Sequence, residues 1–176
     1  EKETPAPVFF AGDDSQLRDM VENAGVGLYS IDMDGRFHFV NRWFAEMLGY
    51  ESPEECLQLA LNADDIFADQ DDRASSRERC IQEQQITDFV FEAKRKDGST
   101  LWVSENSSVI REQTGEVSGF LGSITDVTSF VEASKKLEAA ELDFRRFVER
   151  AHEGIYRSSL DGQQLMANPA LVRLNG

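Results

Sequence analysis

The chain has 176 residues, which is enough for one domain with a remainder. Its formal net charge of −15, from 33 acidic against 18 basic residues, repels phosphate backbones and leaves no basic patch for a membrane surface, so we expect no nucleic-acid partner. Two cysteines, Cys56 and Cys80, are too few for a disulfide framework and fit a reducing compartment. Since no window holds the roughly 18 apolar residues of a membrane helix, we expect a cytoplasmic location, with any membrane anchor elsewhere in a longer parent protein.

An internal repeat organises the chain. A shift of 127 residues places Leu17–Gly49 over Phe144–Gly176 without a gap. The identical residues include glycines, a turn dipeptide and an asparagine, so they record backbone geometry as well as apolarity. Among the identical residues are Val21, Glu22, Ala24, Gly27, Tyr29, Asp34, Gly35, Asn41 and Gly49. The repeat predicts one complete unit followed by the start of a second copy.

The first half of the unit alternates helical and extended patterns. Residues 1–14 read as a loose leader, and Ser15–Ala24 carries a helical apolar stripe. Two strands are expected next, Gly25–Asp32 and Arg36–Val40, joined by a hairpin turn at Asp34-Gly35. Helices are then expected at residues 41–48, after the Ser52-Pro53 start signal, and at 73–84.

Three further strands complete the unit. They are expected at Ile86–Arg95, Thr100–Ile110 and Val117–Val127, with Gly98 in the turn between the first two. Two strands, several short helices and three strands predict an α+β fold with five antiparallel strands.

A long helix is predicted over Thr128–Ala151. Its apolar residues recur at alternating steps of three and four, the spacing of a coiled-coil seam. They are Phe130, Ala133, Leu137, Ala140, Phe144, Phe147 and Ala151. A strict heptad repeat favours a partner helix over the chain's own sheet, so we expect a homodimer through this helix.

Together these pieces resemble the PAS family with the C-terminal PAC motif of its last three strands. Each piece is weak alone, and their order is specific. The matching segments are Glu22-Asn23-Ala24, Gly27-Leu28-Tyr29, Asp32–Gly35, Val40-Asn41, Leu48-Gly49-Tyr50, Ser52–Glu55, Phe67, Asp71-Asp72-Arg73, Lys94–Ser99, Trp102-Val103, Gly119-Phe120 and Thr125–Thr128. The resemblance divides the chain into a leader (1–14), a PAS domain (15–128), a signalling linker helix (129–151) and the truncated start of a second PAS domain (152–176).

The resemblance implies a sheet with short helices around a pocket on one face, and a place in bacterial signal transduction. The parent protein would carry an output such as a histidine kinase of a two-component system or a cyclic-dinucleotide enzyme. Adjacent PAS and output domains of the same chain, and a small-molecule ligand, are the partners this predicts.

Structural and signalling roles fall on different residues. Asn41 stands where a strand meets a helix, so we expect it to cap the helix, with ligand contact as the alternative. Gly35 and Gly98 are expected in tight turns. The predicted signalling residues surround the exit into the long helix; they are Asp126, Thr128, Phe130 and Leu137. Asp126 caps the helix or forms a switchable ion pair.

The predicted pocket residues come from four strands, on the assumption that alternate residues share a face. They are Phe37, Phe39, Phe89, Phe91, Trp102 and Ser104. We expect a mostly apolar pocket, either open to a ligand or filled by its own phenylalanines.

The cofactor is not fixed by the sequence. The haem-binding branch of the family needs a histidine on the helix at 73–84, which has none, so haem is not expected. Cys56 does not match the motif of the light-sensing flavin branch, so a covalent flavin is not expected either. The acidic stretch near Asp71 lacks the glycine of a calcium loop, so we expect no metal.

No catalytic constellation is recognisable with two histidines and no phosphate-binding loop, so we expect no enzyme activity in this part of the parent protein. A sensory module that relays ligand state through its exit helix is the main hypothesis. A ligand-free dimerisation and relay module is one alternative, and a redox sensor with a non-covalent flavin or other cofactor is another.

Overall fold

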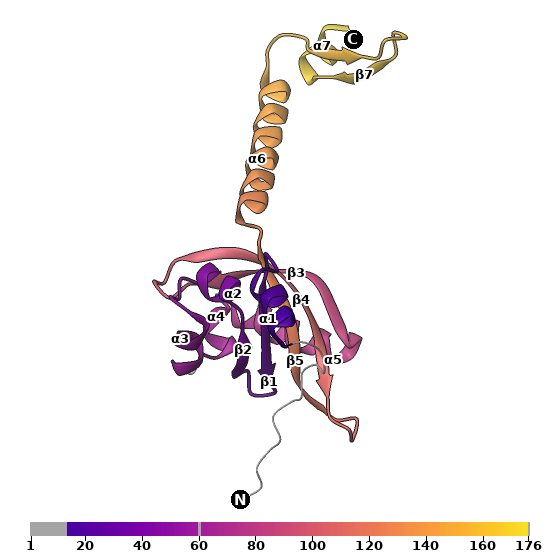
Figure 1. Ribbon diagram of the computed structural model, residues 1–176. Coiled ribbons are helices and arrows are strands. Elements are labelled where there is room, and N and C mark those ends of the chain that lie inside the picture. Colours follow the sequence, from indigo (N-terminus) through magenta and orange to yellow (C-terminus); the bar gives the residue numbers. More distant parts are fainter. Residues whose placement is uncertain (1–13, 60, 176) are drawn as a thin grey trace, which may run out of the picture. The chain divides into compact units, whose positions relative to one another are not determined.

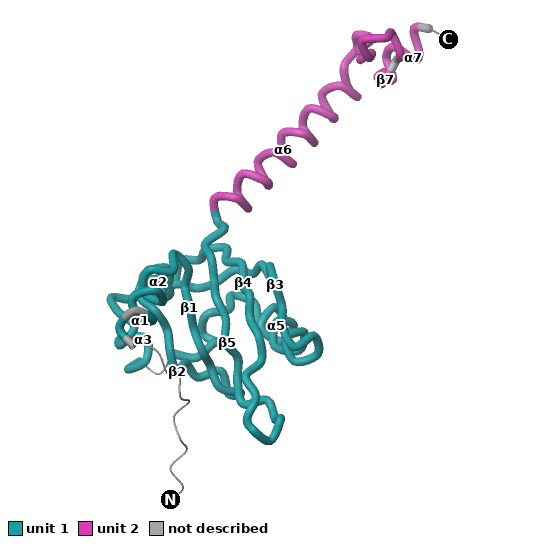
Figure 2. The backbone as a smooth tube through the Cα atoms, turned by 45° about the vertical axis from the view of Figure 1, so that its right-hand side comes forward, with its two compact units in different colours: residues 1–128 teal, residues 129–176 magenta. Residues whose placement is uncertain are grey.

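The computed structural model of the chain describes residues 14–59 and 61–175 (Figure 1). The chain divides into unit 1, residues 1–128, and unit 2, residues 129–176 (Figure 2). The predicted leader lies outside the described residues except for Asp14, where the first helix begins. Among the helices described, none is long and apolar enough to cross a membrane.

A five-stranded antiparallel sheet forms the frame of unit 1, in the order β2-β1-β5-β4-β3 (Figure 1). Its strands are β1 (Gly27–Asp32), β2 (Phe37–Val40), β3 (Gln85–Lys94), β4 (Thr100–Arg111) and β5 (Val117–Asp126). Because β5 returns to pair with β1, the first hairpin and the last three strands belong to one sheet. The predicted α+β fold is confirmed.

The helices between β2 and β3 cover one face of this sheet. Ser52 accepts a hydrogen bond from the N–H of Glu55, with Pro53 in the first turn, as the start signal predicted. Along β4 the buried positions alternate from Leu101 to Ser107 and define the inner face. The helices are α1 (Asp14–Glu22), which precedes β1, and α2 (Arg42–Met47), α3 (Pro53–Gln58), α4 (Ala63–Ile66) and α5 (Gln70–Glu83).

Aromatic rings fill much of the space between the helices and the inner face. The ring centroid of Phe44 lies 5.1 Å from that of Phe37 and 5.9 Å from that of Tyr29. Farther along the sheet, Phe67 stacks on Phe91 with centroids 3.8 Å apart. Burial of such large rings supplies much of the hydrophobic stabilisation of a small domain.

Asn41 links α1, β1 and α2. Its Oδ1 accepts hydrogen bonds from the N–H groups of Leu28 (2.8 Å) and Phe44 (3.0 Å). Its Nδ2 donates to the carbonyl groups of Val21 and Val26, both at 2.9 Å. The side chain is fully buried, and the predicted capping role is confirmed.

The two glycines predicted in turns both adopt left-handed backbone conformations. Gly35 has φ +82°, and a Cβ atom there would lie 2.7 Å from Oδ1 of Asn62. Gly98 has φ +84° with open space around it. Gly35 is therefore constrained by its backbone and by its neighbour, and Gly98 by its backbone alone.

Unit 2 repeats the hydrogen bonds of Asn41 at the predicted offset. Oδ1 of Asn168 accepts from the N–H groups of Ile155 (2.8 Å) and Leu171 (3.0 Å). Its Nδ2 donates to the carbonyl groups of Val148 (3.0 Å) and Glu153 (2.9 Å). Each partner lies 127 residues after the corresponding partner in unit 1, so the repeat extends to individual atoms.

The strands of unit 2 follow the same plan. The long helix α6 (Thr128–Arg150) leads to β6 (Tyr156–Ser158), β7 (Gln164–Ala167) and α7 (Pro169–Asn175). β6 pairs with β7 as β1 pairs with β2, and the register shifts at the corresponding step in both hairpins. The described part of unit 2 thus reproduces the first hairpin of unit 1 and the start of the helix after it.

Replacing Asn41 with Ala should lower the free energy of unfolding of unit 1 by about 2–4 kcal/mol. The change removes a helix cap and leaves buried N–H and C=O groups without partners. Urea titration followed by tryptophan fluorescence measures the loss. Asn168→Ala is the matched control, since it removes the same bonds from unit 2; an equal loss in both variants would contradict a local role for Asn41.

Candidate functional site

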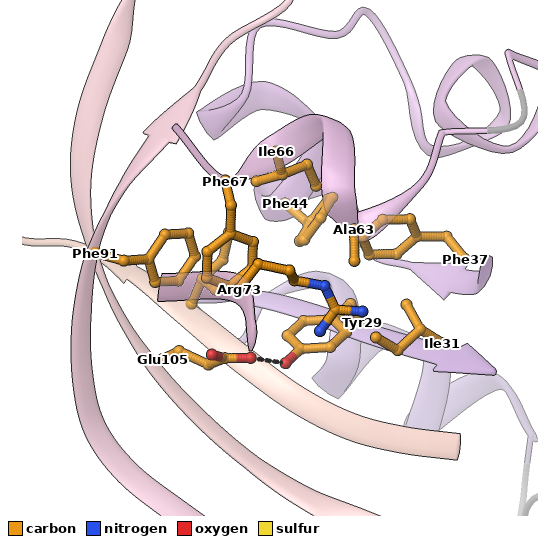
Figure 3. A pocket seen from close by; sticks show the side chains of 11 residues that line it. Tyr29, Ile31, Phe37, Phe44, Ala63, Ile66, Phe67, Arg73, Phe91 and Glu105 are labelled. Carbon is orange, nitrogen blue, oxygen red and sulfur yellow. Dashed lines mark hydrogen bonds between the residues drawn. The ribbon is translucent and has the colours of Figure 1, made fainter. Parts of the chain in front are cut away.

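A cavity of about 30 Å³ lies between the inner face of the sheet and helices α4 and α5 (Figure 3). Most of its wall is aromatic or aliphatic, and two of its lining side chains are charged. The lining residues are Tyr29, Ile31, Phe37, Phe44, Ala63, Ile66, Phe67, Arg73, Phe91, Glu105 and Ile124. The site is therefore a largely apolar chamber that contains one cation and one acid.

Glu105 is the acid, and it is only 6% exposed. The hydroxyl groups of Tyr29 and Ser76 donate to its two carboxylate oxygens, the latter at 2.7 Å. Burial raises the pKa of Glu105 above its ordinary value, although these hydrogen bonds and the nearby Arg73 oppose the rise. Burial, and then the charge of Glu105, raises the pKa of the Tyr29 hydroxyl well above its usual range.

Arg73 is the cation, on α5, and it is 9% exposed. Its Nε donates to Oδ1 of Asp64 at 2.9 Å, and its guanidinium carbon lies 5.7 Å from the ring centroid of Phe67. In Figure 3 the terminal nitrogens of the guanidinium extend past Phe67 toward Tyr29. The ion pair and the ring hold the guanidinium so that it faces the cavity.

Of the six predicted pocket residues, Phe37 and Phe91 line the cavity. Phe89 packs against the core beside Phe91, with ring centroids 6.2 Å apart. Phe39 is 38% exposed, because the register of β1 and β2 shifts between Ser30 and Ile31. That bulge breaks strict alternation, so the prediction that Phe37 and Phe39 share the pocket is wrong.

The prediction that Trp102 and Ser104 line the pocket is also wrong. Both alternate with the buried residues of β4, so their side chains belong to the opposite face of the sheet. Sequence reasoning instead missed Glu105 and Arg73. Glu105 could have been found from the alternation of β4, because it lies two residues after Val103 and four after Leu101, on the face of the strand that those apolar residues share.

The exit from the sheet is held by hydrogen bonds between β4 and the start of α6. Oδ1 of Asp126 accepts from the N–H of Thr128 at 2.8 Å, and its Oδ2 lies 3.8 Å from Nη2 of Arg95. The N–H of Trp102 donates to Oγ1 of Thr128 at 2.9 Å. Asp126 therefore contacts the first residue of α6 and a cation, whereas its predicted role as a switch stays a prediction.

In the part of the chain that the structure describes, the remaining chemically reactive side chains form no second site. Both cysteines are buried, and burial raises the pKa of Cys56 to about 11, which disfavours a reactive thiolate. His38 is exposed beside Asp32, with 3.2 Å between its Nε2 and the carboxylate. Within residues 14–59 and 61–175, no group of three His, Cys, Asp or Glu side chains could hold a metal ion.

Replacing Glu105 with Gln should change how stability depends on pH. Because the pKa of Glu105 is raised in the fold from an ordinary value of 4.5, its stabilising contribution is complete below that value and is lost as pH rises through the folded pKa. The free energy of unfolding of the unmodified chain, minus that of Glu105→Gln, should therefore fall as pH rises from 4.5. Urea titrations across this range measure it. The exposed Glu116→Gln is the control, and a pH-independent difference for Glu105→Gln would refute the raised pKa.

Comparison with known proteins identifies the family of this fold. Residues 15–127 match the model of the PAS fold. The RNA-binding light-oxygen-voltage receptor shares 24% identity at TM-score 0.59, over 73% of this chain and 37% of that one. A sensory box histidine kinase/response regulator from Burkholderia thailandensis E264 shares 20% at TM-score 0.57, over 76% and 99%. A PAS domain from a two-component sensor histidine kinase shares 19% at TM-score 0.54, over 64% and 95%.

These structural likenesses show the fold, and the chain spans little more than a third of the light-oxygen-voltage receptor. No curated protein sequence matches. The family match ends at residue 127, before α6 and unit 2. Since the match covers the sheet, the helices on its inner face and the cavity between them, this chain belongs to the PAS family over residues 15–127.

Proposed function

We propose that this chain is the sensory and regulatory module of a multidomain bacterial signal-transduction protein. Its output would be a histidine kinase or a cyclic-dinucleotide enzyme, and the chain itself is not the enzyme. The similarity to PAS domains of sensor histidine kinases supports this proposal. A change at the cavity shifts β4 and β5, and α6 carries the change to neighbouring domains.

The observation that carries the proposal is that the cavity and the exit share two strands. Glu105 of β4 and Ile124 of β5 are register partners, and both line the cavity. Two residue pairs along the same ladder, Val103 pairs with Asp126. Any displacement of the paired strands at the cavity therefore reaches the contacts of Asp126 and Thr128 within a few residues.

A ligand-free relay is the second candidate, and the size of the cavity supports it. About 30 Å³ has room for only a few atoms, while pockets for drug-sized ligands are roughly 300–1,000 Å³. A flavin ring system would need the chamber to open considerably. The redox-sensor alternative therefore has less support than either a very small ligand or mechanical strain.

The seam of α6 supports dimerisation in either case. Phe130, Leu137, Phe144 and Phe147 are 62–72% exposed, and they recur at heptad spacing. Because that spacing suits the same helix of a second copy, we propose a parallel pair of α6 helices. The pair would bring two sensory units under one output.

Unit 2 is, in this proposal, the start of a second PAS unit. The atom-by-atom correspondence of Asn168 with Asn41 supports it, and so does the close approach at Gly154. A Cβ atom there would lie 2.7 Å from Leu171, just as one at Gly27 would meet Phe44, the residue equivalent to Leu171. The chain would then carry two successive sensory units joined by α6.

Replacing Asp126 with Ala should uncouple the cavity from α6 without unfolding unit 1. In the otherwise unmodified chain, Glu105→Gln should shift the amide resonances of the first turns of α6 in NMR spectra. With Asp126→Ala present, those shifts should shrink several-fold, because the contact between sheet and helix start is lost. Glu116→Ala, an exposed change at the β4–β5 turn, should leave them intact; undiminished shifts in Asp126→Ala would contradict the relay.

Replacing Leu137 with Asp should weaken dimerisation by at least about tenfold, since it places a charge in the apolar seam. Ala139→Asp is the matched control, because it adds the same charge to an exposed position off the seam. Sedimentation equilibrium of the 176-residue chain measures both. Equal dissociation constants for the two variants, or a monomeric unmodified chain, would rule out the seam as the dimer contact.

A further inference from the structure

We infer that the cavity takes a small uncharged molecule that both donates and accepts hydrogen bonds, held between Arg73 and Glu105. A short amide or alcohol has this chemistry. The inference rests on the proposed sensory function of the cavity, and it names the class of ligand and the two groups that select it.

Size sets the first limit. A water molecule needs roughly 10–15 Å³ of such space, and the cavity has about 30 Å³. The chamber as it stands therefore holds a compound of roughly two to four non-hydrogen atoms. A ligand this small binds weakly, with a dissociation constant no lower than about tens of micromolar.

Glu105 supplies the acceptor. Its two oxygens each receive one hydroxyl donor, from Tyr29 and Ser76. A carboxylate has about four lone-pair sites, so acceptor capacity is left for an N–H or O–H group of a ligand. A second anion in the chamber would be repelled by this carboxylate in a medium of low dielectric constant.

Arg73 supplies the donors. Among the hydrogen bonds of the described residues, its guanidinium uses Nε, toward Asp64. Its terminal amino groups extend toward Tyr29 (Figure 3), with Nη2 close to Gly35 of the β1–β2 turn. Arg73 and Glu105 both line the cavity, yet the ion pairs of the described residues join Arg73 to Asp64 and not to Glu105. The space therefore separates two opposite charges that both belong to buried residues.

Opposite charges on two walls select against both kinds of ion. An anion that pairs with Arg73 meets Glu105, and a cation that pairs with Glu105 meets Arg73. An uncharged amide satisfies both, because its carbonyl accepts from the guanidinium and its N–H donates to the carboxylate. Its methyl group then faces the rings of Phe37 and Phe44.

Three molecules of nearly the same shape test this selection: acetamide, acetate and acetamidinium. Each is titrated into the ¹⁵N-labelled 176-residue chain, and the amide shifts of Tyr29, Glu105 and Ile124 are followed by NMR. We expect saturable shifts with acetamide and at least about tenfold weaker binding of the two ions, the factor expected for one unfavourable charge contact.

Two variants should change this preference in opposite directions. Glu105→Gln removes the acid, so acetate should bind at least about tenfold more tightly than to the unmodified chain. Arg73→Gln removes the cation, so acetamidinium should bind more tightly than to the unmodified chain by a similar factor. Arg79→Gln, an exposed arginine of the same helix that does not line the cavity, is the matched control and should change none of the three affinities. A loss of fold would weaken the binding of all three molecules together. A variant that gains affinity for one ion therefore cannot owe this change to unfolding.

Equal binding of acetamide and either ion would overturn the inference, and so would the absence of saturable shifts with acetamide. Those failures differ from a failure of the proposed function. If acetamide binds as expected but the α6 resonances stay unmoved, the ligand class holds and the relay is refuted. If Glu105→Gln moves those resonances while acetamide does not bind, the relay holds and the ligand class is refuted.

Discussion

Unit 1 depends on how one buried carboxyl group is satisfied. Glu105 lies on the inner face of β4, where a carboxylate without partners would be strongly destabilising. Its two donors come from different elements, Tyr29 of β1 and Ser76 of α5. The same contacts that remove the penalty therefore fix the first hairpin and the longest helix of the inner layer against the central strands.

This arrangement requires room on the strand that lies between β1 and β4. Tyr29 pairs with Gly122 of β5, and a Cβ atom at Gly122 would lie 2.6 Å from the Tyr29 hydroxyl oxygen. A larger residue there would displace the ring and leave Glu105 with Ser76 as its remaining donor. The strand that makes this room ends at Asp126, so the geometry of the site and of the exit is set by the same two strands.

The fold could be predicted from the sequence because its signals are local. The Asp34-Gly35 turn and the Ser52 cap each determine the backbone within a few residues, and all four partners of the Asn41 side chain lie within 20 residues of it. The site could not be predicted in this way, since both faces of β4 carry residues suited to a core. Glu105 faces inward, and Trp102 therefore outward, because Tyr29 donates a hydrogen bond to Glu105. Tyr29 stands 76 residues earlier in the chain, so no local pattern records this contact. The prediction that Phe39 lines the pocket was wrong for a related reason, since the β-bulge beside it is visible only in the paired strands.

Comparison of the two copies of the repeat shows which structural features depend on nearby residues and which depend on distant strands and helices. Asn168 is as buried as Asn41 and makes the same bonds, so about thirty residues suffice for that junction. Tyr156, the equivalent of Tyr29, is 64% exposed where Tyr29 is 4% exposed. The difference is that Tyr29 has β4, β5 and α5 around it. The repeat thus carries the shape of the hairpin and helix start, whereas the cavity of unit 1 also needs residues of β4, β5 and α5 around the tyrosine.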